Sequence, residues 1–185
     1  DMKLMSGVSI IGLIASLVGI VMGPYLANRV GKKKVYLTAV IISTALNLLR
    51  LLDVTSMILI YISALIGGVA GGWMVPVSTS IQADNTTYVQ YKTGKRAEAA
   101  IASLTSFVSK VAQGLGGAIP GYVIAAYGFV TGASVQPESI NTGIILCALI
   151  LPLIFGILGS LIFGTQYTLD QKAVIEMDAK INRNN

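Results

Sequence analysis

The charged residues of this chain are distributed very unevenly, and this constrains its fold more than any other feature. Four long stretches contain no Asp, Glu, Lys or Arg: residues 4–28, 54–83, 111–137 and 139–169. Each is longer than the roughly 20 mostly apolar residues that an α-helix needs to cross a bilayer. Charged residues make up 11% of the 185 residues, against about 25% in a typical soluble domain. The sequence therefore predicts an all-α membrane protein.

The composition also argues against an enzyme. The chain has no histidine, which removes the commonest general base and metal ligand, and Cys147 is its one cysteine. No span carries paired carboxylates, and no nucleotide-binding fingerprint is present. We therefore expect no catalytic residue, no metal site and no cofactor.

Hydropathy and charge together predict five spans joined by short connections. A transmembrane bundle is expected over residues 1–169, followed by a polar cytoplasmic tail at 170–185. The second span ends with Arg50, whose long side chain can reach the membrane surface. The expected spans are residues 5–27, 35–52, 57–82, 99–128 and 141–166.

The positive charges predict the orientation of these spans. The loops 28–34 and 83–98 and the tail 170–185 carry four, three and three Lys or Arg residues, ten of the 13 in the chain. Because Lys and Arg concentrate in cytoplasmic connections, we expect both loops and the C-terminus to be cytoplasmic in a multi-pass protein of the cell membrane. The net charge of +5 then reflects topology in the bilayer, not nucleic-acid binding. Five spans with an exterior start, at Asp1, predict a fragment that lacks an upstream helix.

Small residues and prolines recur inside the expected spans. Glycines four residues apart allow helix backbones to approach closely in lipid, whereas prolines kink or break helices. These residues indicate either ordinary close packing or helices that move during gating. The glycine pairs are Gly19/Gly23, Gly67/Gly71, Gly68/Gly72 and Gly117/Gly121, and the prolines are Pro76, Pro120 and Pro152.

The first motif is the run Gly23-Pro-Tyr-Leu-Ala-Asn-Arg-Val-Gly-Lys-Lys-Lys at the end of the first span. On its residues alone it is a basic, positive-inside anchor. Its spacing also resembles the loop signature of the major facilitator superfamily, in which this cytoplasmic loop stabilises one conformational state. That resemblance implies a gating role for Asn28, Arg29 and Gly31. Asn28 replaces the usual acidic residue, so this position can make a hydrogen bond but not an ion pair.

The second motif lies in the segment 83–98 and is longer. By composition it is a polar loop with aromatic residues, but its order of residues resembles the central loop of the glycoside–pentoside–hexuronide:cation symporters, which include melibiose and glucuronide permeases. Thr87 and Gln90 depart from the pattern, because acidic residues are usual there. The resemblance implies a conformational role for this segment. The matching residues are Asp84, Tyr88, Tyr91, Lys92, Thr93, Gly94, Arg96, Ala97 and Glu98.

Lys110 is the one charge deep inside an expected span. It lies about 17 Å from the start of the fourth span, near the bilayer midplane, where an ammonium group must face protein or water. Small and polar residues share its helix face and predict a cavity lining: Ser103, Ser106, Gln113, Gly114, Gly117 and Gly121. A structural lysine bonded to carbonyls or to a carboxylate is the alternative. The symporter resemblance implies a sugar site formed by Lys110, Thr105 and Ser106.

Trp73 is the single tryptophan and lies deep in the third span, between Gly72 and Pro76. Sugars stack their apolar faces on aromatic rings, and the symporter resemblance implies that use. Ordinary packing of the indole is the alternative.

Taken together, the resemblance covers the chain as the second to sixth helices of the C-terminal half of a twelve-helix transporter of the major facilitator type. It implies sugar or glycoside, including hexuronide, symport with Na⁺, Li⁺ or H⁺ by alternating access. The cation is expected to bind mainly to the N-terminal half, which would be the chain's partner together with lipid. Two alternatives remain: another facilitator carrier, for drugs or organic anions, and a non-transporting membrane scaffold.

Overall fold

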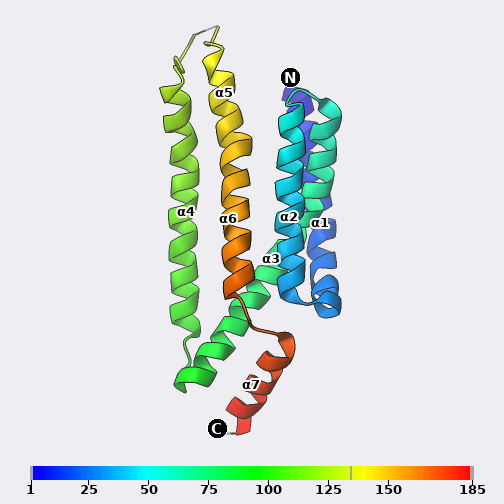
Figure 1. The fold of residues 1–185 in the computed structure, drawn as a ribbon, viewed down its shortest axis with the longest axis vertical. Coiled ribbons are helices and arrows are strands. Elements are labelled where there is room, and N and C mark those ends of the chain that lie inside the picture. The colour runs from blue at the N-terminus through cyan, green and yellow to red at the C-terminus, as the bar shows by residue number, and fades with distance from the viewer. Residues whose placement is uncertain (1, 134, 184–185) are drawn as a thin grey trace.

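A computed structural model describes residues 2–133 and 135–183, and within these residues the regular structure is entirely helical (Figure 1). This confirms the predicted all-α class. The elements are α1 (Met2–Val30), α2 (Lys32–Leu52), α3 (Met57–Thr93), α4 (Glu98–Ala126), α5 (Ser139–Ile145), the π-helical turn η1 (Leu146–Ile150), α6 (Leu151–Gln166) and α7 (Gln171–Arg183).

Four of the described helical segments are long and apolar enough to cross a membrane: Ser6–Val30, Lys32–Leu52, Met57–Thr93 and Ser139–Gln166. They correspond to the first, second, third and fifth expected spans. Helix α4 is also long enough, at about 44 Å. It is not among these four because Lys110, Gln113 and several glycines interrupt its apolar residues.

The helices α1, α2 and α3 form a three-helix bundle, and the continuous rod of α5, η1 and α6 packs beside α2 (Figure 1). Helix α4 lies on the outside against this rod, and none of its residues is buried. The short helix α7 returns to pack against the end of α3. The molecule is therefore closely packed on one side and open along α4.

The close packing of α1 against α3 depends on glycine. A Cβ atom added to Gly19 or Gly72 would collide with a backbone carbonyl oxygen of the opposite helix, that of Val69 or Ser16. A Cβ on Gly68 would lie 2.7 Å from the carbonyl oxygen of Gly12. The close-packing interpretation is thus confirmed for Gly19, Gly23, Gly68 and Gly72, whereas a Cβ on Gly71, Gly117 or Gly121 would meet nothing within 4 Å.

Two connections are shorter than the sequence indicated. Helix α3 does not end near residue 82 but continues to Thr93, so the expected loop 83–98 is reduced to residues 94–97. It stops at Gly94, whose φ of 68° lets its N–H bond to the carbonyl of Gln90. In the loop 28–34, Gly31 alone separates α1 from α2, with φ of 93°. Hydropathy marks where a helix leaves the membrane, not where it ends.

The prolines have different effects. Helices α3 and α4 continue through Pro76 and Pro120, so neither proline breaks its helix. Helix α3 changes direction along its length (Figure 1). Before Pro152 the helix widens into η1. Proline has no N–H and its ring crowds the preceding turn, so a wider turn relieves that contact while the rod from Ser139 to Gln166 stays helical.

Candidate functional site: a buried ion pair and an exposed lysine stripe

The first residue of α2 and the extension of α3 are joined by an ion pair. Lys32 Nζ lies 2.7 Å from both carboxylate oxygens of Asp84. Asp84 is 5% exposed and is the one buried charged residue in the described part of the chain. Gly31 makes the contact possible, because its positive φ turns the chain so that α2 begins beside α3. The two sequence motifs, which lie far apart along the chain, therefore meet at one point.

Tyr167, the residue that caps α6, completes this cluster. Its hydroxyl donates a hydrogen bond of 3.2 Å to Asp84 Oδ2. Its ring stacks on Phe163 with centroids 4.9 Å apart, and Phe163 contacts Tyr36 at 4.5 Å. Burial, followed by the negative charge of Asp84 and the hydrogen bond to it, raises the pKa of Tyr167 well above its usual value near 10. The phenol therefore remains a donor throughout the physiological range.

A cavity of about 200 Å³ opens beside the Lys32–Asp84–Tyr167 cluster. Lys33 and Lys34 line it from the start of α2, and Asp170 and Gln171 line it from the start of α7. The cluster therefore connects α2, α3 and the α6–α7 junction at a polar, solvent-accessible end of the bundle.

The other residues of the first motif lie outside this cluster. Asn28 is exposed, and its side chain makes no hydrogen bond to a described residue. The guanidinium of Arg29 lies 4.4 Å from the ring centroid of Tyr25, on its own helix. The ion pair of this motif comes instead from Lys32.

The rest of the second motif follows the extension of α3 and the turn after it. Lys92 lies 5.9 Å from the ring centroid of Tyr88, and Lys180 of α7 lies 5.7 Å from that of Tyr91. Arg96 and Glu98 approach to 4.0 Å, but their side chains are 77% and 63% exposed. Such exposed pairs contribute little to stability, so Asp84 is the structural centre of this motif.

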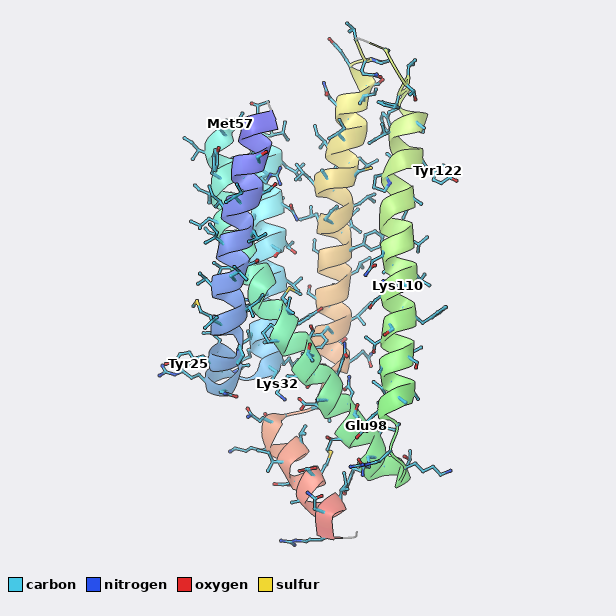
Figure 2. The ribbon with its side chains drawn as sticks, turned by 180° about the vertical axis from the view of Figure 1, so that it is seen from behind. Tyr25, Lys32, Met57, Glu98, Lys110 and Tyr122 are labelled. Atoms are coloured by element: carbon cyan, nitrogen blue, oxygen red, sulfur yellow. The ribbon has the colours of Figure 1, made fainter. Side chains whose placement is uncertain are left out.

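Lys110 lies midway along α4, on a face that no other described helix covers (Figure 2). Its Nζ contacts Gln113 Oε1 at 3.5 Å, one turn along the same helix. The small and polar residues predicted to share its face are all exposed: Ser103, Ser106, Gln113, Gly114, Gly117 and Gly121. We call this set, with Lys110, the Lys110 stripe.

Thr105 and Ser106 do not occupy equivalent positions. Ser106 is one turn from Lys110 and belongs to the Lys110 stripe, whereas Thr105 is five residues away, about 140° around the helix. Thr105 is half-buried, as is Ile101 one turn before it, so this side of α4 is the more covered one. The structure therefore brings Ser106, but not Thr105, onto the face of Lys110.

Trp73 lies apart from the Lys110 stripe. It packs against the core formed by Ala27, Val35, Val77, Ile81 and Tyr167. Its indole Nε1 is buried and has no hydrogen-bond partner among the described residues. Its backbone lies against Gly23, where an added Cβ would be 2.9 Å from the Trp73 carbonyl oxygen. The four residues predicted to bind substrate are thus divided between the α1–α3 core and the open face of α4.

Sequence reasoning missed two residues of the cluster. Lys32 was visible as part of a basic run but could not be told apart from Lys33 and Lys34. Tyr167 follows the last span and belongs to no motif, so only the return of the chain after α6 shows its role.

Comparisons with known proteins agree with this architecture. Residues 1–171 match the family model described as MFS/sugar transport protein. The isoprimeverose transporter of Lactiplantibacillus pentosus is 28% identical over 71% of this chain and 28% of its own length. The glucuronide carrier protein homolog of Escherichia coli (strain K12) is 29% identical over 92% of this chain and 39% of its own length. An uncharacterized symporter of Bacillus subtilis (strain 168) is 32% identical over 87% and 35%, respectively.

The chain thus spans 28% to 39% of the length of these curated relatives. The family match covers all four apolar helices, α4, and the cluster of Lys32, Asp84 and Tyr167. This chain is a multi-pass membrane protein that belongs to the MFS/sugar transport family, within the glycoside–pentoside–hexuronide:cation symporters.

Proposed function

We propose that this chain forms five helices of the C-terminal half of a twelve-helix transporter that carries a sugar or glycoside with a cation by alternating access. The spans are α1, α2, α3, α4 and the rod from α5 to α6. The observation that carries the proposal is the Lys110 stripe: a midspan ammonium group on a polar helix face that the rest of the described chain leaves open. In a membrane such a face must meet water, solute or another helix.

The Lys110 stripe suits a sugar. The ammonium group and the Ser106 hydroxyl supply hydrogen bonds for hydroxyls, and the charge of Lys110 favours a substrate with a carboxylate, such as a hexuronide. A glucuronide carrier among the relatives supports this class. Thr105 and Trp73 remain predicted substrate residues that would need a change of helix packing to join the stripe. The coupling cation, Na⁺, Li⁺ or H⁺, is proposed to bind mainly to carboxylates of the N-terminal half.

The Lys32–Asp84–Tyr167 cluster is proposed as the cytoplasmic gate of this half. It joins α2, α3 and the end of α6 by a single buried carboxylate, so these elements are held together in the conformation described here. Separation of the helices during alternating access would expose Asp84 to water. Hydration of its carboxylate would then offset the free energy lost with the contacts to Lys32 and Tyr167. A contact of this kind is stable in one state and is replaced at modest cost in another.

The proposed orientation places this gate in the cytoplasm. The end of α1, the start of α2, the end of α3 with the turn 94–97 that follows it, and the whole of α7 carry ten of the 13 Lys and Arg residues. By the positive-inside tendency these ends and the C-terminus are cytoplasmic.

The function is tested by uptake in the full-length transporter that contains this chain. Lys110→Ala is expected to abolish, or lower by at least about tenfold, uptake of a labelled glucuronide, because the charge-assisted hydrogen bonds are lost. Lys172→Ala, an exposed lysine on α7, is the matched control and is expected to transport normally. Unchanged uptake and unchanged cation dependence in Lys110→Ala would show that Lys110 does not bind the substrate.

A further inference from the structure

A second cavity lies at the other end of the three-helix bundle, far along α2 from Lys32. It has a volume of about 240 Å³ and lies among α1, α2 and α3. Its polar lining consists of Ser43, Asn47 and Arg50 from α2 and Ser63 from α3. Gly67 of α3 adds no side chain to the wall, which keeps the space open.

The three α2 residues form one stripe that leads into the membrane. Ser43, Asn47 and Arg50 follow each other at spacings of four and three residues, so they lie on the same helix face. They extend over about 10 Å of helix. Arg50 is two residues from the end of α2, and Ser43 is about 14 Å from that end. The cavity therefore begins near the membrane surface and extends into the span.

The polar groups of this cavity have no partners in the described part of the chain. Ser43, Asn47, Arg50 and Ser63 are each half-buried, and none makes a hydrogen bond or ion pair with another described residue. Polar groups inside a membrane are costly when they are unsatisfied. Four of them around one space indicate that a polar ligand or water occupies it.

No acidic residue in the described part of the chain lines the cavity. Asp53 is the nearest acid in the sequence, but it is exposed and its Oδ1 accepts hydrogen bonds from Thr55, at 3.0 Å from the backbone nitrogen and 2.8 Å from the hydroxyl. These bonds lower the pKa of Asp53 below its usual value. Among the described residues, no carboxylate therefore neutralises the positive charge of Arg50. The carbonyl end of its own helix favours a cation there.

We propose that this cavity binds an oxyanion through Arg50, with Asn47, Ser43 and Ser63 holding the hydroxyl-bearing group attached to it. A guanidinium presents paired donors that match a carboxylate or a phosphate. An amide and two hydroxyls bind hydroxyls of a sugar or a glycerol. Two sources share this chemistry: a sugar acid arriving from the side opposite the Lys32–Asp84–Tyr167 cluster, and the headgroup of an anionic lipid. The site is separate from the Lys110 stripe and does not depend on the chain being a symporter.

The sugar-acid source is tested by calorimetric titration of the full-length transporter, purified in a neutral detergent, with glucuronate and with glucose as the uncharged control. The measurement uses the Lys110→Gln background, so that binding at the Lys110 stripe does not contribute. Arg50→Gln is expected to weaken glucuronate binding by about ten- to a hundredfold, because a charge-assisted pair is lost. Arg183→Gln, which removes an exposed guanidinium from α7, is expected to leave it unchanged.

The lipid source is tested in nanodiscs made of phosphatidylglycerol or of phosphatidylcholine. Native mass spectrometry is expected to show one retained phosphatidylglycerol that Arg50→Gln loses and Arg183→Gln keeps. Asn47→Ala, which preserves the charge, is the second variant and is expected to weaken the same ligand by several-fold. The proposal is overturned if neither glucuronate affinity nor retained lipid changes in Arg50→Gln, or, where that variant does not fold, in Asn47→Ala.

These results separate the cavity from the proposed function. If Arg50→Gln changes neither glucuronate binding nor the retained lipid, while uptake still depends on Lys110, the oxyanion site is wrong and the proposed function is unaffected. If binding depends on Arg50 but Lys110→Ala transports normally, Lys110 does not bind the substrate and the oxyanion site is still supported.

Discussion

Lys32 and Asp84 are 52 positions apart in the sequence, yet the ammonium nitrogen lies 2.7 Å from both oxygens of the carboxylate. The side chains are 18% and 7% exposed, respectively. Breaking one partner of a mostly buried pair leaves an uncompensated charge, whereas the intact pair contributes little beyond its desolvation cost. The pair therefore specifies one arrangement of helices more than it adds to overall stability.

Asp84→Asn is expected to destabilise the full-length transporter by about 3 kcal/mol, because Lys32 loses its counter-ion while remaining mostly buried. Thermal unfolding in detergent measures this change. Glu98→Gln is the matched control, because its ion pair with Arg96 is long and exposed. That control is expected to lose less than about 1 kcal/mol. Equal losses in both variants would contradict the special position of Asp84.

Tyr167→Phe removes the hydroxyl donor to Asp84 and keeps the stacked ring. We expect a loss of about 1.5–3 kcal/mol, the usual range for a hydrogen bond to a charged group. Unfolding curves at pH 7 measure it. Phe163→Leu is the complementary variant, because it removes the stacking partner and keeps the hydrogen bond.

The same residue predicts an effect of alkaline pH. The folded-state pKa of Tyr167 is above its unfolded value near 10, so its contribution is fully present below pH 10 and is lost as the pH rises toward the folded pKa. The difference in unfolding free energy between the unsubstituted protein and Tyr167→Phe is therefore expected to shrink above pH 10. A difference that grew with pH would mean that the pKa of Tyr167 is lowered instead.

Gly71 and Gly72 offer a matched test of the α1–α3 contact. Gly72→Ala would drive a methyl group into the backbone of Ser16 and is expected to cost about 1–3 kcal/mol or more. Gly71→Ala meets nothing within 4 Å and is expected to be neutral or slightly stabilising, since alanine favours a helix. Thermal unfolding of both variants measures the difference, and similar values would contradict the described helix contact.

The exposed face of α4 is tested by cysteine labelling after Cys147→Ala removes the native thiol. Ser106→Cys is expected to react with a water-soluble maleimide and to be protected by substrate, because it shares the face of Lys110. Thr105→Cys, turned about 140° away and half-buried, is expected to react more slowly. Faster labelling at residue 105 than at residue 106 would contradict this orientation of α4, in which Ser106 is exposed and Thr105 is half-buried.

Much of this architecture could be predicted from the sequence because hydropathy and charge act locally. The apolar runs located α1, α2, α3 and the α5–α6 rod to within a few residues at most ends. The extension of α3 to Thr93 could not be located in this way, because polar residues such as Asp84 and Gln90 form a helix outside the membrane as readily as a loop. The end of α3 depends on Gly94 and its positive φ.

Contacts between segments that are distant in the sequence were harder to predict. Four-residue glycine spacing marked both Gly67/Gly71 and Gly68/Gly72, yet only the second pair faces α1 closely, since this depends on the rotation of α3. The polar ends of two motifs suggested a shared cytoplasmic surface, but the pairing of Lys32 with Asp84 depends on how α2 begins after Gly31. The stripe of Lys110 with Ser106 followed from helical periodicity alone.

The unbroken length of α3 has a mechanical consequence. Its 37 residues span about 55 Å, nearly twice the hydrocarbon thickness of a bilayer. A rod of this length that tilts by about 10° around its centre displaces each end by about 5 Å. A tilt of the membrane-embedded part would therefore move Tyr91, and α7 packed on the end of α3, further than residues near the middle of the helix. Through its length, α3 would transmit a change of helix tilt inside the membrane to a surface that lies in water.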